Sequence, residues 1–113
     1  VPHGMSVILN APAVFRWTGS ADPENHLRCA ELMGTDVSGA TSDDAGEVLA
    51  SSVIHLMKKA GLPNGLKAVG YGPEDVPALV EGTLPQHRVT KLAPLPAGPG
   101  ELKDLFMGNM THW

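Results

Sequence analysis

The chain has 113 residues, of which 42% are hydrophobic and 18% are charged, so it has the length of one domain and enough apolar residues to form a core. This balance argues against intrinsic disorder. The net charge is −4, from 8 basic and 12 acidic residues that form no run of either sign, which argues against nucleic-acid and anionic-membrane partners.

The ends of the sequence and its single cysteine bear on where the protein works. Cys29 cannot form an internal disulfide, which favours a reducing, intracellular location. No signal or transit peptide is expected, and no apolar run is long enough to span a bilayer. The sequence begins at Val1 rather than at methionine and runs directly into an apolar segment, so we expect its N-terminal end to be a cut end.

Four segments are expected to form helices, and no segment has the alternating pattern of a convincing strand. The first helix, over 5–17, is apolar on nearly all sides, and Pro12 in its interior should kink it. A helix of this kind is normally covered by neighbours on every side. It is therefore either central to a small bundle, or part of its cover is missing.

The next two helices have recognisable start and stop signals. The helix over 23–33 has Asp22 as its expected N-cap, and Gly34 should end it in a left-handed conformation. The longest helix, over 43–60, has Ser42 as its expected N-cap.

The second half of the chain is richer in glycine and proline. We expect loops or short turns over 61–73, a brief helix near 74–80 with Ala78, Leu79 and Val80 packed inward, and irregular chain over 85–100. A closing amphipathic helix should cover 101–112. The sequence thus predicts an all-α chain with long loops.

Catalytic and metal-binding motifs are scarce. No glycine-rich phosphate loop is present, so no nucleotide site is encoded in this sequence. Cys29 is expected to be a buried or half-buried structural thiol. A metal site needs three or four converging ligands, and no two histidines are spaced to share one helix face. The histidines are His3, His26, His55, His87 and His112.

Four of these five histidines need no special explanation. His26, His55 and His112 are expected on polar or boundary faces of helices, and His87 in an exposed loop. His3 differs, because it lies in Pro2-His3-Gly4 directly before the apolar helix. The proline restricts the backbone, and the glycine permits close approach of another group. One imidazole does not make a metal site, so on spacing alone a structural role and a ligand role both stay open.

The sequence resembles the iron-containing alcohol dehydrogenase family in several blocks that occur in the family's order. The block over 2–15, PHGMSVILNAPAVF, resembles the stretch that enters the metal site of that family. Four further blocks resemble its hydroxyacid-oxoacid transhydrogenase branch: 26–34, 65–71, 75–80 and 82–88.

The resemblance implies a fold, a cofactor and a reaction. It implies that 1–113 is the C-terminal helical metal-binding domain of a dehydroquinate synthase-like, iron-containing alcohol dehydrogenase fold, incomplete at its N-terminus and without the nucleotide-binding domain. In the family one aspartate and three histidines hold Fe²⁺ or another divalent ion such as Zn²⁺, and His3 matches the last histidine. The missing N-terminal domain would bind NAD(P).

The same resemblance implies a hydride transfer between a hydroxyacid or alcohol and a nicotinamide cofactor, with 4-hydroxybutyrate and 2-oxoglutarate as the branch's pair of acids. Arg88 and Lys91 could neutralise a substrate carboxylate, although a charge in a loop is more often merely solvated. A homo-oligomer is compatible with the resemblance. The location would be mitochondrial in a eukaryote and cytoplasmic in a bacterium, and the isolated 113 residues are expected to be inactive.

Two other readings stand beside this one. The chain could be an autonomous helical interaction module that retains the family's sequence without its catalysis. It could also be a small metal-binding protein that uses His3, although a stable site needs at least three protein ligands. The sequence that precedes Val1 in the native protein would distinguish these readings.

Overall fold

A computed structural model describes residues 3–85 and 94–113 of the chain. The described residues form α-helices joined by short 3-10 turns and loops, with no strand among them, as the sequence predicts. The helices are α1 (His3–Thr18), α2 (Pro23–Leu32), α3 (Ala45–Lys59), α4 (Val76–Thr83) and α6 (Pro99–Gly108). In this part of the chain no helix combines the length and hydropathy needed to cross a bilayer.

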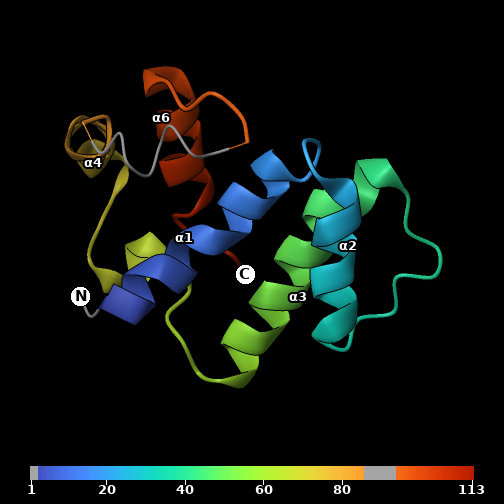
Figure 1. The fold of residues 1–113 in the computed structure, drawn as a ribbon. Coiled ribbons are helices and arrows are strands. Elements are labelled where there is room, and N and C mark those ends of the chain that lie inside the picture. Colours follow the sequence, from blue (N-terminus) through green and yellow to red (C-terminus); the bar gives the residue numbers. More distant parts are fainter. Residues whose placement is uncertain (1–2, 86–93) are drawn as a thin grey trace.

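Helix α1 lies between two helix pairs (Figure 1). On one side α3 packs against it, with α2 behind α3. On the other side α6 packs against it, with α4 next to α6. The buried core joins these elements around the middle of α1, and its members are Leu9, Ala30, Leu49, Val53, Met57, Leu66, Val76 and Met110. An exposed ion pair between Arg16 and Glu47, 2.7 Å apart, also links α1 to α3.

The cover of α1 is incomplete within the described residues. Leu9, Pro12 and Ala13 are buried, whereas Val7 on the same helix is 56% exposed. Of the two alternatives that the apolar pattern left open, the described residues show a central position for α1, and a missing part of its cover stays a prediction. Burial of a valine side chain contributes about 1.5 kcal/mol or more, so this exposed surface is a site at which further cover would be stabilising.

The start signal of α2 is confirmed, and that of α3 differs from the prediction. The Asp22 side chain accepts a hydrogen bond from the Asn25 N–H, and Gly34 has the expected positive φ of 96°. Ser42 does not cap α3. It begins a 3-10 turn, Ser42–Asp44, in which the Asp44 carboxylate accepts hydrogen bonds from both the N–H and the hydroxyl of Thr41, each at 3.1 Å.

The closing helix is displaced toward the N-terminus relative to its predicted range. It begins at Pro99, because proline fits the first turn of a helix, where no intrahelical N–H bond is lost. It ends at Gly108 because the following residues leave the helix to pair with a loop: the Leu66 N–H donates to the Asn109 carbonyl at 2.9 Å. Of the three residues predicted to pack inward, Leu79 and Val80 pack against the core, whereas Ala78 is exposed on α4.

Candidate functional site

His3 is the first residue of α1, and its side chain is exposed. The Ser6 hydroxyl donates a hydrogen bond to the His3 carbonyl at 2.7 Å, which satisfies part of the first helical turn. No described residue hydrogen-bonds either ring nitrogen of His3. A Cβ built on Gly4 would meet nothing within 4 Å, so the close approach that this glycine permits is not made by any described residue. As far as the described residues go, the ring nitrogens of His3 are therefore available to a ligand.

A complete metal site is not assembled in this part of the protein. Among residues 3–85 and 94–113, no group of three or more His, Cys, Asp or Glu side chains could hold a metal ion. An imidazole nitrogen suits Fe²⁺ and Zn²⁺ as a ligand, so His3 has the right chemistry for one ligand position. The remaining ligands would have to come from elsewhere.

His26 has a structural role on the boundary of the core. Its Nδ1 lies 2.6 Å from the Asp22 carbonyl, and its Nε2 lies 2.7 Å from the Thr18 hydroxyl. Since a carbonyl only accepts, Nδ1 carries a proton and donates, and in the neutral ring Nε2 accepts from Thr18. The ring also meets Phe15 edge to face at a centroid distance of 6.1 Å. Both ring nitrogens of His26 are therefore hydrogen-bonded.

His55 is exposed on α3, as the sequence predicts for a polar or boundary face.

His112 is bound to the middle of α1. Its Nε2 donates a hydrogen bond to the Leu9 carbonyl at 2.8 Å, while its Nδ1 is buried without a partner in the described structure. The pKa of His112 is lowered, and burial is the largest cause of this shift. The hydrogen bond to the Leu9 carbonyl raises the pKa in part, whereas the positive charge of Arg16 lowers it further. A neutral ring suits the site, since a proton on Nδ1 would find no acceptor.

Asn109 was not predicted as an important residue, although it is 1% exposed and fully hydrogen-bonded. Its Oδ1 accepts from the Ala13 N–H at 3.1 Å, and its Nδ2 donates to the Asn10 carbonyl at 3.1 Å. A lone asparagine near the end of a helix carries no local signal for this role. Only the proline inside α1 indicates that backbone groups there need partners from another segment.

Cys29 is exposed, which corrects the expectation of a buried thiol. Helix α2 turns its buried Ala30 toward α3. Successive residues on a helix point about 100° apart, so Cys29 lies away from that contact.

We expect a thiol reagent to modify Cys29 in the native protein, without denaturant, because the sulfur is accessible to solvent. Modification by dithiobis-nitrobenzoate, followed by peptide mapping with mass spectrometry, measures this, and Cys29→Ser is the matched control. A Cys29 peptide that reacts only after unfolding would contradict the described exposure.

Three of the polar residues considered above lie outside the described residues. These are His87, Arg88 and Lys91. The predicted irregular chain over 85–100 is described only at Pro85 and from Pro94 onward, where residues 94–98 are indeed not helical.

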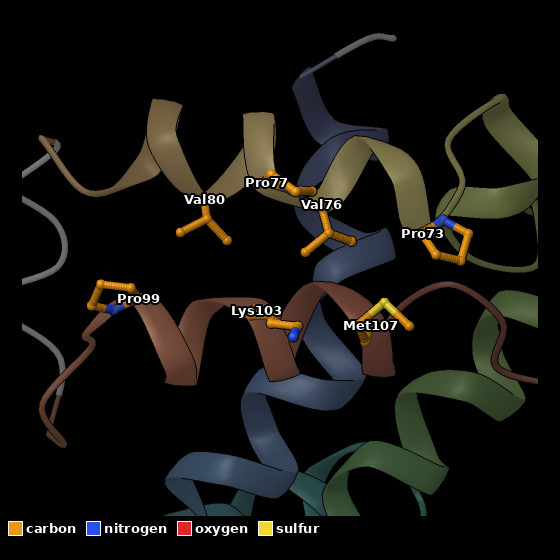
Figure 2. Close-up of a pocket in the computed structure, with 7 residues that line it drawn as sticks. All are labelled: Pro73, Val76, Pro77, Val80, Pro99, Lys103 and Met107. Atoms are coloured by element: carbon orange, nitrogen blue, oxygen red, sulfur yellow. The ribbon is translucent and has the colours of Figure 1, made fainter.

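An apolar groove of about 450 Å³ lies between α4 and α6. Figure 2 shows Val76 and Val80 of α4 facing Lys103 and Met107 of α6 across it. Among the described residues that line it, Lys103 is the one with a charged side chain, so this part of the lining offers no set of groups for acid–base or metal chemistry.

Comparison with known proteins gives a consistent result. Residues 1–110 match the model of the Fe-containing alcohol dehydrogenase family, C-terminal. A Dictyostelium discoideum protein named "Probable hydroxyacid-oxoacid transhydrogenase, mitochondrial" is 52% identical over 98% of this chain, which covers 20% of that protein. The human mitochondrial hydroxyacid-oxoacid transhydrogenase is 50% identical over 97% of this chain and is covered to 24%.

A solved structure is similar in fold as well. The crystal structure of a 1,3-propanediol oxidoreductase superposes with a TM-score of 0.86 at 28% identity, over 96% of this chain and 28% of that one. The chain thus spans about a fifth to a quarter of the length of the relatives it matches.

Proposed function

The chain belongs to the Fe-containing alcohol dehydrogenase family, whose C-terminal domain it matches, and on this premise we propose that it is the metal-binding helical part of an oxidoreductase. The full-length protein would move hydride between a hydroxyacid or alcohol and a nicotinamide cofactor. Relatives at about 50% identity that are named hydroxyacid-oxoacid transhydrogenases support a reaction of that kind. The pair of acids would be 4-hydroxybutyrate and 2-oxoglutarate, as the family resemblance implies.

The observation that carries the proposal is the placement of His3. Its exposed imidazole begins the family-matched helix α1, and no described residue engages its ring nitrogens. His3 would hold Fe²⁺, or another divalent ion such as Zn²⁺, through the lone pair of one neutral ring nitrogen. A divalent ion at such a site supplies a Lewis acid that lowers the pKa of a substrate hydroxyl.

The remaining parts of the site would come from the portion of the full-length protein outside this chain. That portion would supply the other metal ligands and the domain that binds NAD(P), so the 113 residues alone would be inactive. The exposed Val7 surface of α1 would be covered by it. The names of the relatives support a mitochondrial location if the source is eukaryotic.

His3→Ala in the full-length protein is expected to lower bound metal and turnover together, by about a hundredfold or more, because a direct ligand is removed. Metal content by atomic emission and the rate of hydroxyacid-dependent cofactor reduction measure the two effects. His55→Ala, which removes an exposed imidazole from α3, is the matched control and should change neither. Retention of metal at a near-native rate by His3→Ala would refute the proposed role of His3.

A further inference from the structure

Helix α1 lacks one backbone hydrogen-bond donor in its interior, and no other group of its own backbone can replace it. Pro12 lies buried in the interior of the helix and has no N–H, and its ring crowds the carbonyl of Ile8, four residues earlier. Kinks at such prolines open the neighbouring backbone hydrogen bonds as well. Buried backbone groups that lose a partner are costly, so the groups around Pro12 need partners from outside the helix.

The C-terminal segment supplies those partners. An uninterrupted helix would join the Ala13 N–H to the Leu9 carbonyl. Here the Ala13 N–H donates to the Asn109 Oδ1 at 3.1 Å, and the Leu9 carbonyl accepts from the His112 Nε2 at 2.8 Å. Both groups of this pair around Pro12 are therefore bonded to one short segment. We call Asn109 and His112 together the C-terminal clasp.

The clasp is itself held by the 3-10 turn Leu66–Val69 and by Asn64, which lies just before that turn. The Leu66 N–H donates to the Asn109 carbonyl at 2.9 Å, and the Lys67 N–H donates to the Met110 carbonyl at 3.0 Å. The Asn64 side chain accepts hydrogen bonds from the N–H groups of His112 and Trp113. Because its backbone is fixed in this way, the clasp can impose a position on α1 rather than follow it.

We propose that the C-terminal clasp fixes the direction of the N-terminal half of α1 and thereby positions the His3 imidazole for metal binding. This inference rests on the proposed function of His3. Asn109 and His112 act on the α1 backbone, so they are positioning residues and not ligands.

The distance along α1 from Pro12 to His3 makes the position of His3 sensitive to any change in helix direction at Pro12. His3 precedes Pro12 by nine residues, which is about 14 Å at 1.5 Å per residue. A change of about 5° in helix direction at Pro12 would move His3 by about 1 Å. Metal–ligand distances in proteins are held to about 0.2 Å, so even a small loosening at the clasp would disturb a site that includes His3.

The test uses the full-length protein, with Co²⁺ as the probe metal. His112→Ala and His112→Asn both remove the bond to the Leu9 carbonyl, the second because its shorter side chain cannot reach. His112→Gln retains an N–H donor at a similar distance. His55→Ala removes an exposed histidine from α3 and is the matched control. Circular dichroism verifies that each variant is folded.

Three measurements are made on each variant: the Co²⁺ dissociation constant, the visible spectrum of the bound Co²⁺, and amide hydrogen exchange over residues 8–14 without metal. We expect His112→Ala and His112→Asn to weaken Co²⁺ binding about tenfold or more, to alter the spectrum, and to accelerate exchange. His112→Gln should restore binding to within about threefold of the native value. A change of spectrum in the folded variants separates positioning from a loss of stability.

The outcomes distinguish this inference from the proposed function. If His3→Ala abolishes Co²⁺ binding while His112→Ala and His112→Asn keep the native affinity and spectrum, the positioning role is wrong and the proposed function stands. If His3→Ala binds Co²⁺ as the native protein does, the proposed function of His3 and the positioning role of the clasp are both wrong. If His55→Ala weakens Co²⁺ binding as much as His112→Ala, the effect is not specific to the clasp and the inference is overturned.

Discussion

Gly65→Ala is expected to lower the free energy of unfolding by about 3 kcal/mol or more. Of the substitutions that only add a methyl group to a glycine, this one should have the largest effect. Gly65 has φ 81° and ψ −174°, a conformation that is essentially confined to glycine. A Cβ at this position would also lie 2.4 Å from the Met110 carbonyl oxygen and 2.6 Å from that of Asn109. These are backbone atoms, so relief would require the C-terminal segment to move.

A second glycine separates the cost of the backbone conformation from the cost of the close contact with the C-terminal segment. Gly70 also has a positive φ, of 102°, but a Cβ there would meet nothing within 4 Å. Gly70→Ala should therefore show the conformational cost alone, about 1 kcal/mol. Urea unfolding of the two variants gives the comparison. Equal losses in both would mean that the close contact between Gly65 and the C-terminal segment does not exist in solution.

Gly46→Ala is expected to destabilise the protein by about 2 kcal/mol or more, although alanine is the better helix former by about 1 kcal/mol. Gly46 lies in the first turn of α3, where the helix meets the end of α1. A Cβ on Gly46 would lie 2.8 Å from the carbonyl oxygens of Phe15 and Arg16. A Cβ on Gly19 would come within 2.4 Å of the Gly46 Cα, so the two backbones touch directly.

The matched control for Gly46 is a helical glycine with open space around it. Gly82 lies in α4, and a Cβ there would meet nothing within 4 Å. Gly82→Ala should be neutral or should stabilise the protein by up to about 1 kcal/mol. Thermal and urea unfolding measure both variants. A Gly46→Ala protein as stable as the native one would show that α1 and α3 are farther apart than described.

The features that could be predicted from the sequence are those that depend on local signals. Asp22 and Gly34 bound α2 as expected, because capping depends on residues only a few positions apart. The apolar spacing along α3 predicts a buried stripe of Val48, Leu49, Val53, Leu56, Met57 and Ala60. Leu49, Val53 and Met57 are indeed in the core, whereas Leu56 and Ala60 are exposed. The family resemblance, spread over several ordered blocks, was confirmed by the match over residues 1–110.

The features that could not be predicted depend on contacts between distant residues. Asn109 bonds to residues of α1 that lie 96 and 99 positions away, and nothing near it in the sequence indicates this. The same pairing ends α6 at Gly108, where helical periodicity alone would continue. The role of His3 as a ligand also comes from resemblance, since the described residues place its ring at the start of α1 but bring no second ligand to it.

The sequence separation across the C-terminal clasp has a consequence for how the chain folds. Closing a loop of about 100 residues costs roughly 4 kcal/mol in chain entropy before its contacts form. The Ala13 N–H and the Leu9 carbonyl lie 96 and 103 positions before their partners Asn109 and His112, so these two hydrogen bonds can form only after the whole intervening stretch has been synthesised. Helix α1 and the other helices depend on residues close together in sequence and can form sooner. The contact between α1 and the C-terminal clasp is therefore expected to form late in folding, after the individual helices.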